Sequence, residues 1–212
     1  MADIAESTPE RIGGGRAVAW AKSAFDRTAA FMGLLALSPF LLLVAAAIRL
    51  DSAGPVLFMQ ERYGRGAKTF RIYKFRTMTA EASRGPFRQA AAGDARITRL
   101  GHFLRDSSID ELPQLLNVVR GDMALVGPRP HPMALDDAFR EEIPDYMRRY
   151  DVRPGITGLA QIGGHRGATP TVEAMAARVR LDLDYVARHS LGLDLLILLR
   201  TVLYVFKVRD GR

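Results

Sequence analysis

The stretch LRDSSIDELPQLLNVVRGDMALVGPRP, residues 104–130, decides how the rest of the chain is interpreted. Its apolar residues recur at the i, i+3, i+4, i+7 spacing of one helix face; they are Leu112, Leu115, Leu116 and Val119. Gly121 follows as a typical helix stop. We expect Asp110 to be the N-cap, because Pro113 then lies in the first turn, where a missing N–H costs nothing. With Ser108 as the cap, Pro113 would lie too deep in the helix.

An adjacent carboxylate pair, Asp110 and Glu111, stands at this helix start. A helix N-terminus suits a phosphate and keeps a carboxylate ionised. With an ordinary pKa of about 3.9, Asp110 would be a poor general acid near neutrality but an available nucleophile for phosphoryl transfer. Mg²⁺ held by Glu111 and Asp110 would neutralise charge, with Arg105 and Arg129 as nearby cations. The alternative, which the residue types alone favour, is a capped helix whose carboxylates only complement the dipole.

The segment 29–48 is an uncharged run of 20 residues, which is long enough to span a bilayer. Ser38 and Pro39 stand at its middle, where proline kinks a helix. Positive charges on both sides give no preferred crossing direction. A kinked, re-entrant helix that enters and leaves on one membrane face fits both features. A straight span and a buried helix of a soluble core are the alternatives.

Two short strands, 56–61 and 69–76, are expected after this segment. Lys74 and Arg76 share parity, so both point to one side of the second strand. They either contact a phosphate or a lipid headgroup, or they lie on a solvated strand face.

Three later segments add to the candidate site. Arg129 stands in the rigid turn Gly-Pro-Arg-Pro, 127–130, which is either a substrate contact or a structural turn. Arg153 opens a glycine-rich loop and strand, 152–164, in which backbone can approach closely. The small and polar residues 80–95 are predicted to form a surface loop over the site.

Helices account for much of the remaining chain. They are expected at 98–106, at 132–150 in two pieces broken at Pro144, from 169 to about 189, and at 191–208. Arg148 and Arg149 are interpreted as a solvated face. Asp194 and Arg200 interrupt the apolar 191–208 segment, which therefore suits an interfacial or a core helix.

Composition limits the classes of function. The 212 residues are 48% hydrophobic and carry a net charge of +7, which favours an anionic partner such as a membrane surface or a nucleotide-linked substrate. The basic residues are dispersed, which argues against nucleic acid as a partner. The chain has no cysteine, which excludes disulfides and cysteine-based metal sites. The expected organisation is a flexible tail at 1–16, a re-entrant membrane helix at 17–50 and a cytosolic catalytic domain at 51–212.

The segment SSIDELPQLLNVVRGDMALVGPRP resembles the signature of the bacterial sugar transferases, which are small monotopic phosphoglycosyl transferases. The resemblance continues through YKFRTM, RPGITGLAQ and LDLDYVARHSLGLDL and covers roughly residues 17–208. It implies an α/β monotopic membrane protein with a re-entrant helix, a small antiparallel sheet and interfacial amphipathic helices. It also implies a place on the cytoplasmic face of the bacterial inner (plasma) membrane.

The implied reaction moves a hexose-1-phosphate, of glucose or galactose, from a UDP-sugar to undecaprenyl phosphate and releases UMP. Asp110 would form an aspartyl phosphosugar, while Glu111 and Mg²⁺ neutralise charge. The substrate would be bound by Arg105, Arg129, Lys74, Arg76 and Arg153. Such a step begins the assembly of a polysaccharide or glycoconjugate.

The same resemblance leaves other partners and another class of function open. Membrane lipids, a homo-oligomer and downstream glycosyltransferases are the expected partners. Because only about 28 residues precede the apolar run, we expect the minimal form of the family, without further N-terminal domains. The competing hypothesis is a non-catalytic, membrane-anchored scaffold of the same fold. A basic nucleic-acid binder would leave the apolar run unexplained.

Overall fold

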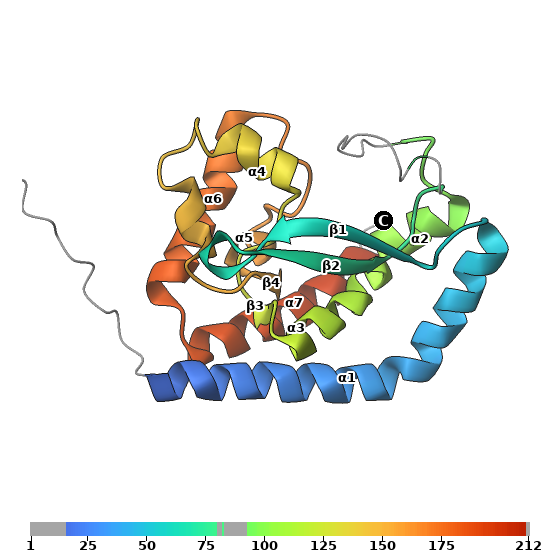
Figure 1. The fold of residues 1–212 in the computed structure, drawn as a ribbon, viewed down its shortest axis with the longest axis horizontal. Coiled ribbons are helices and arrows are strands. Elements are labelled where there is room, and N and C mark those ends of the chain that lie inside the picture. Colours follow the sequence, from blue (N-terminus) through green and yellow to red (C-terminus); the bar gives the residue numbers. More distant parts are fainter. Residues whose placement is uncertain (1–15, 80–81, 83–92, 211–212) are drawn as a thin grey trace, which may run out of the picture.

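The computed structural model describes residues 16–79, 82 and 93–210 and shows a mixed α/β fold (Figure 1). Its helices are α1 (Arg16–Asp51), α2 (Arg99–Asp106), α3 (Leu115–Arg120), α4 (Met133–Phe139), α5 (Leu159–Ile162), α6 (Val172–Arg188) and α7 (Leu191–Asp210). Short 3-10 helices are η1 (Arg65–Ala67), η2 (Ile109–Gln114) and η3 (Tyr146–Tyr150). The predicted tail, apart from Arg16, and most of the predicted 80–95 loop lie outside the described residues.

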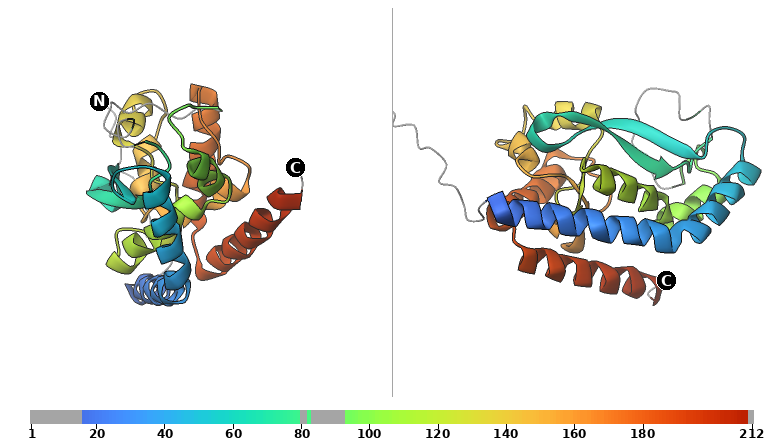
Figure 2. Two further views of the ribbon diagram at one scale, coloured as in Figure 1. Left: turned by 90° about the vertical axis from the view of Figure 1, so that its right-hand side faces the viewer. Right: turned by 60° about the horizontal axis from the view of Figure 1, so that its bottom comes forward.

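The apolar segment lies within α1, a helix of 36 residues that contains Pro39. Proline has no N–H to donate to the carbonyl of Leu35, and the hydroxyl of Ser38 donates to that same oxygen at 2.8 Å. Both views show α1 changing direction along its length (Figures 1 and 2). By length and composition, Ala19–Asp51 is able to cross a membrane, and only 11% of its most apolar window is buried.

Two pairs of strands make two separate small sheets. Strands β1 (Leu57–Tyr63) and β2 (Thr69–Phe75) pair antiparallel, as expected. Strands β3 (Ala124–Val126) and β4 (Gly155–Thr157) pair parallel, an arrangement that the sequence did not predict. A Cβ added to Gly155 would lie 2.1 Å from the backbone nitrogen of Gly127, so glycine is required for the two chains to approach this closely.

The cores on the two halves of α1 hold the helix to different parts of the fold. Toward its N-terminal half, Ala30 packs with Ile72, Val118 and Met123. Toward its C-terminal end, Val44 and Ile48 pack with Phe75 and Leu104. Because fully burying one such large side chain is worth about 1.5–3 kcal/mol, these contacts fix α1 beside β2, α2 and α3.

The helical stretch that follows Ser108 differs from the expectation in its first turns. It begins at Ile109 as the 3-10 helix η2, and Ser108 precedes it with a left-handed φ of 60° and no side-chain cap. The prediction of Asp110 as N-cap is therefore wrong. The 3-10 hydrogen-bond pattern places Pro113 inside η2 rather than in the first turn of an α-helix. The predicted stop is confirmed, since Gly121 caps α3 with a φ of 88°.

The C-terminal half supplies two long helices. Helix α6 is capped by the side chain of Thr171, which accepts from the backbone N–H of Ala174 at 3.2 Å. Helix α7 follows and is joined to α1 by an ion pair of 2.5 Å between Asp194 and Lys22. The left view of Figure 2 shows α7 starting near the N-terminal half of α1 and diverging from it toward the C-terminus.

Candidate active site

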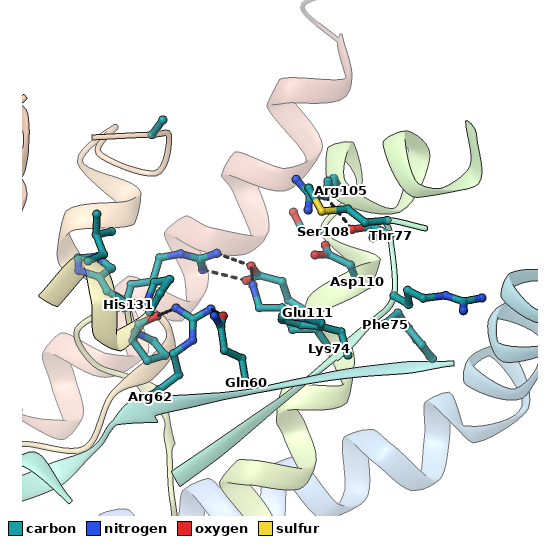
Figure 3. Close-up of a pocket in the computed structure, with 18 of the residues that line it drawn as sticks. Gln60, Arg62, Lys74, Phe75, Thr77, Arg105, Ser108, Asp110, Glu111 and His131 are labelled. Atoms are coloured by element: carbon teal, nitrogen blue, oxygen red, sulfur yellow. Dashed lines mark hydrogen bonds and ion pairs between the residues drawn. The ribbon is translucent and has the colours of Figure 1, made fainter. Parts of the chain in front are cut away.

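A cavity of roughly 640 Å³ opens between the β1–β2 sheet, η2 and the loop before α6 (Figure 3). Among the described residues that line it, eight are cationic and two are carboxylates. The cations are Arg62, Lys74, Arg76, Arg96, Arg105, Arg129, Arg166 and Arg178, and the carboxylates are Asp110 and Glu111. This volume is typical of small-molecule sites, and the excess of positive charge suits an anionic ligand such as a phosphate.

The carboxylate of Glu111 is held by two cations from different parts of the chain. Arg129 donates to both of its oxygens, with Nη1 to Oε2 at 2.9 Å, and Lys74 donates to Oε1 at 2.8 Å. Burial alone would raise the pKa of Glu111, but Arg129 and Lys74 together hold that pKa well below its usual range. Glu111 is thus a fixed anion that orients two cations in the cavity.

The side chain of Asp110 lies on the opposite side of Glu111, toward Thr77, Arg105 and Ser108 (Figure 3). It is buried, with 8% exposure, and it lines the cavity without a hydrogen bond to any other residue that the structure describes. Burial and the neighbouring Glu111 charge raise the pKa of Asp110 to about 6. This corrects the expectation of an ordinary pKa near 3.9. At neutral pH, Asp110 is mainly an ionised carboxylate with few partners, as a nucleophile requires.

Two further arginines flank Asp110. Arg105 on α2 donates from Nε to the hydroxyl of Thr77 at 2.8 Å. Arg166 donates to the hydroxyl of Ser108. Helix α2 can lie this close to Thr77 because Gly101 has no side chain; a Cβ there would lie 2.1 Å from the Thr77 carbonyl oxygen. The geometry therefore brings Arg105 beside the open carboxylate, while Arg166 is held at Ser108.

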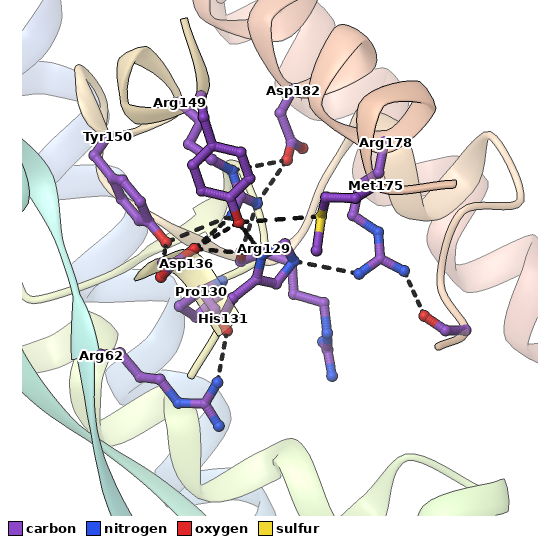
Figure 4. A network of polar contacts seen from close by, with 12 residues as sticks. Arg62, Arg129, Pro130, His131, Asp136, Arg149, Tyr150, Met175, Arg178 and Asp182 are labelled. Carbon is purple, nitrogen blue, oxygen red and sulfur yellow. Dashed lines mark hydrogen bonds and ion pairs between the residues drawn. The ribbon is translucent and has the colours of Figure 1, made fainter. Parts of the chain in front are cut away.

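A buried network of polar side chains lies behind Arg129 (Figure 4). It comprises His131, Asp136, Tyr146, Arg149, Tyr150 and Asp182. Arg149 has no exposed surface, and it donates to Asp182 at 2.6 Å and to the backbone oxygen of Arg129 at 2.8 Å. The interpretation of Arg149 as part of a solvated face is therefore wrong, although Arg148 is exposed as expected. This buried network fixes the backbone from which Arg129 reaches Glu111.

The predicted site residues divide into two groups. Asp110, Glu111, Lys74, Arg105 and Arg129 are brought together in the cavity, as the sequence indicated.

Arg76 and Arg153 have other partners. Arg76 lines the cavity, but its guanidinium donates to the backbone oxygens of Ser52 and Ala53, both at 2.6 Å, at the end of α1. Arg153 is not among the described lining residues and donates to the hydroxyl of Ser23 at 3.1 Å. These contacts fasten α1 to the rest of the fold.

The carboxylates of the cavity could hold Mg²⁺ only if the phosphates of a bound substrate completed its coordination. In the part of the chain that the structure describes, no three histidine, cysteine or acidic side chains gather as a metal site. Asp110 has free oxygens, whereas both oxygens of Glu111 already accept from Arg129, and one also accepts from Lys74. Mg²⁺ commonly binds one or two carboxylates and completes its shell with water and substrate phosphates. Asp110 fits that role, and Glu111 would join it by giving up a contact with a cation.

Sequence reasoning missed Arg178 and the depth of the buried network. Arg178 lies in α6 between two other buried residues, Met175 three positions before it and Asp182 four positions after it. Charged residues at helical spacing on the face that also carries Met175 were the available signal, because a buried charge needs a partner.

Comparison with known proteins identifies the family of this chain. The family model described as bacterial sugar transferase matches residues 17–208. The UDP-glucose:undecaprenyl-phosphate glucose-1-phosphate transferase of Caulobacter vibrioides is 53% identical over 181 residues, which are 85% of this chain and 68% of that protein. The protein of the same name from Escherichia coli K12 is 46% identical over 85% of this chain, but the match covers only 39% of its own length. The exopolysaccharide production protein PSS of Rhizobium leguminosarum is 45% identical, with 85% and 92% covered. The chain belongs to the bacterial sugar transferase family.

Proposed function

We propose that this chain transfers glucose-1-phosphate from UDP-glucose to undecaprenyl phosphate and releases UMP. The observation that carries the proposal is the open carboxylate of Asp110 beside Arg105 in a strongly cationic cavity. The named activities of the Caulobacter and Escherichia coli relatives support glucose as the sugar, and the name of the Rhizobium relative supports a role in exopolysaccharide production.

In the first step, a carboxylate oxygen of Asp110 attacks the sugar-proximal phosphorus of UDP-glucose. A bond forms between that oxygen and phosphorus, and the bond to the bridging oxygen breaks, so that its electron pair leaves with UMP. In the second step, a phosphate oxygen of undecaprenyl phosphate attacks the same phosphorus and the Asp110 carboxylate leaves. The products are UMP and glucose linked to undecaprenyl diphosphate.

The surrounding cations make an attack of one anion on another feasible. Arg105 lies beside Asp110, while Lys74 and Arg129 are held in place by Glu111 before substrate arrives. Such preorganised charge stabilises a transition state without reorganisation at the moment of reaction. Asp110 and Glu111 are the residues that would hold Mg²⁺, which would add further charge neutralisation.

The proposed lipid acceptor requires the site to lie at a membrane. Large apolar side chains are exposed along α1 and α7; they include Trp20, Phe31, Leu35, Leu42, Leu43, Leu195, Leu199 and Leu203. Two exposed apolar helices on one fold support insertion into a bilayer surface. We propose that α1 is re-entrant and that the domain lies on the cytoplasmic face.

Cysteine accessibility tests that topology. Single cysteines at Ala17 and Ser52 in the otherwise cysteine-free chain are labelled with a membrane-impermeant reagent in sealed inverted vesicles. A re-entrant helix predicts labelling of both from the same side. Labelling from opposite sides would establish a straight span.

The activity is tested by UMP release from detergent-solubilised protein with Mg²⁺ and undecaprenyl phosphate. The donors are UDP-glucose, UDP-galactose and UDP-N-acetylgalactosamine, beside Asp110→Asn and a control without Mg²⁺. We expect release with UDP-glucose that needs Asp110 and Mg²⁺. If folded protein released no UMP from any of these donors, the proposed function would be contradicted.

A further inference from the structure

Two buried arginines at one end of the cavity have no acidic partner. Arg62 on β1 is 7% exposed and Arg178 on α6 is 4% exposed, and both line the cavity. Arg62 donates to Gln60 Oε1 at 2.7 Å and to the backbone oxygen of Pro130 at 3.3 Å. Among the described residues, no carboxylate lies within 4.0 Å of either guanidinium, and neither Nε has an acceptor.

Arg178 is no better neutralised than Arg62. It donates to the backbone oxygen of Gly167, and its Nη1 lies 3.2 Å from Nε2 of His131. Burial and the charge of Arg149 lower the pKa of His131 to about 3, so the imidazole is neutral near pH 7. A neutral imidazole has one acceptor nitrogen, while its two nitrogens face arginine donors from Arg149 and Arg178. Whichever nitrogen carries the proton, His131 supplies no negative charge to Arg178.

Other cations nearby that are buried or partly buried have carboxylate partners. Glu111 pairs with Arg129 and Lys74, and Asp182 pairs with Arg149. A buried charge is costly unless it is paired. Burial, followed by the repulsion of Arg129, lowers the pKa of both Arg62 and Arg178 to about 10; the charges of Asp136 and Glu111 on Arg62, and of Asp182 on Arg178, only partly offset this.

We propose that Arg62 and Arg178 form a second anion subsite, which binds the phosphate of the departing uridine nucleotide while the sugar-proximal phosphate lies at Asp110. Glu111 lies between Asp110 and the Arg62–His131 end of the cavity (Figure 3), and Arg178 reaches the same end from α6 (Figure 4). This inference rests on the proposed function. The two arginines would stabilise the negative charge that develops on the phosphate of UMP when the bond to the bridging oxygen breaks.

The position of this subsite favours a nucleotide over a lipid phosphate. Helices α4 and α6, which border the His131 end, carry none of the large apolar side chains that are exposed on the described part of the fold. Helix α2, beside Asp110, exposes Phe103, as α1 and α7 expose theirs. The helices around the subsite therefore present no large exposed apolar side chain to lipid, whereas Met59 of β1, which also lines the cavity, is 53% exposed.

The test is direct binding of UMP to the full chain in detergent, by titration calorimetry, for Arg62→Gln, Arg178→Gln and Arg178→Lys. Arg188→Gln is the matched control, since this exposed arginine lies on the same helix. Each glutamine variant is expected to weaken UMP binding on the order of tenfold to a hundredfold, as for lost charged hydrogen bonds. Arg178→Lys keeps the positive charge and should recover part of the lost affinity for UMP. Unliganded melting temperatures should stay level or rise, because an unpaired buried charge is removed.

The outcomes separate this inference from the proposed function. If the wild type releases UMP from UDP-glucose but both glutamine variants bind UMP as tightly as the wild type does, the subsite is overturned and the function stands. If the variants lose only the binding of a short-chain polyprenyl phosphate, the nucleotide assignment is wrong. Lower melting temperatures without recovery in Arg178→Lys would show a purely structural role. A wild type that neither binds UMP nor releases it would overturn both proposals.

Discussion

Two groups of buried charge lie back to back in this fold, and they differ in how completely their charges are paired. In the buried network, Asp136 accepts from the hydroxyls of Tyr146 and Tyr150, both at 2.7 Å, and Asp182 pairs with Arg149. In the cavity, Glu111 is paired with two cations, whereas its neighbour Asp110 has no hydrogen-bond partner among the described residues. The same residue types thus form a paired, structural network behind Arg129 and leave the carboxylate of Asp110 unpaired in the cavity.

The difference shows that one group of charges fixes the structure, while the other leaves a carboxylate available for chemistry. Buried hydrogen-bond networks rigidify a core, so the buried network can fix the backbone of Arg129, whose oxygen accepts from Arg149. Arg129 in turn fixes Glu111. The open carboxylate of Asp110 then stands beside a rigid set of charges, with its pKa raised by burial and by Glu111.

Replacing the open carboxylate should have the largest effect on activity. Asp110→Asn is expected to lower kcat/KM by at least about a thousandfold, since the proposed nucleophile is lost. Its melting temperature should stay level or rise, because a buried carboxylate with a raised pKa is costly as an anion at pH 7. Activity and thermal melting of the same preparation check both expectations. A steep fall in melting temperature would place Asp110 with the structural charges instead.

Replacing the central cation of the buried network should mainly cost stability. Arg149→Met leaves Asp136 and Asp182 buried without their cation, which is expected to cost about 3–5 kcal/mol of unfolding free energy. For a domain of this size, that lowers the melting temperature by roughly 10 °C.

The neighbouring arginine provides the control for this prediction. Arg148→Met removes an exposed side chain and should change the unfolding free energy by less than about 0.5 kcal/mol. Equal melting temperatures for the two variants would contradict the contrast between the buried network and the surface.

Glu111 shares a feature with each group: it is paired with cations, as the buried network is, and it lines the cavity, as Asp110 does. Glu111→Gln removes the anion that orients Arg129 and Lys74. We expect kcat/KM to fall by about tenfold to a hundredfold, a smaller loss than for Asp110→Asn. Steady-state kinetics with UDP-glucose measure it, with the exposed Glu142→Gln as control. Wild-type rates in Glu111→Gln would show that the held anion is dispensable.

The pH dependence of the first step should report Asp110 directly. Its pKa of about 6 predicts that the burst of UMP released without a lipid acceptor falls about tenfold for each pH unit below 6. Rapid-quench measurements between pH 4.5 and 8 give this profile. The free energy of unfolding should change with pH in the opposite direction to activity. Because the pKa of Asp110 is higher in the folded state than in the unfolded state, its protonation stabilises the fold at low pH, and this contribution is lost as pH rises through 6. An acid limb near pH 4 would contradict the burial of Asp110.

Local patterns in the sequence were sufficient to predict much of the fold, whereas the centre of the site was inferred from the resemblance to a family. Helix spacing and a glycine stop placed α3, and the strands expected at 56–61 and 69–76 correspond to β1 and β2. These signals act over a few residues, which is why they survive without knowledge of tertiary contacts. The 3-10 start before Pro113 was missed because capping rules assume an α-helix.

Contacts between distant segments were beyond such patterns. Asp136, Arg149 and Asp182 lie 13 and 33 residues apart along the chain and meet only through packing. Arg149 was assigned to the surface because a pair of arginines is usually solvated. The partners of Arg153 and Arg76 on α1 and at its end were equally invisible, since nothing local to either arginine indicates where α1 lies.

The proposed covalent role of Asp110 can be tested most directly by mass spectrometry. The wild type is mixed with UDP-glucose and Mg²⁺ without lipid acceptor, quenched, digested and compared with Asp110→Asn. We predict one hexose phosphate on the peptide that contains Asp110, its disappearance when undecaprenyl phosphate is added, and no adduct in the variant. Turnover by the wild type without any adduct, or UMP release undiminished in Asp110→Asn, would contradict the covalent mechanism.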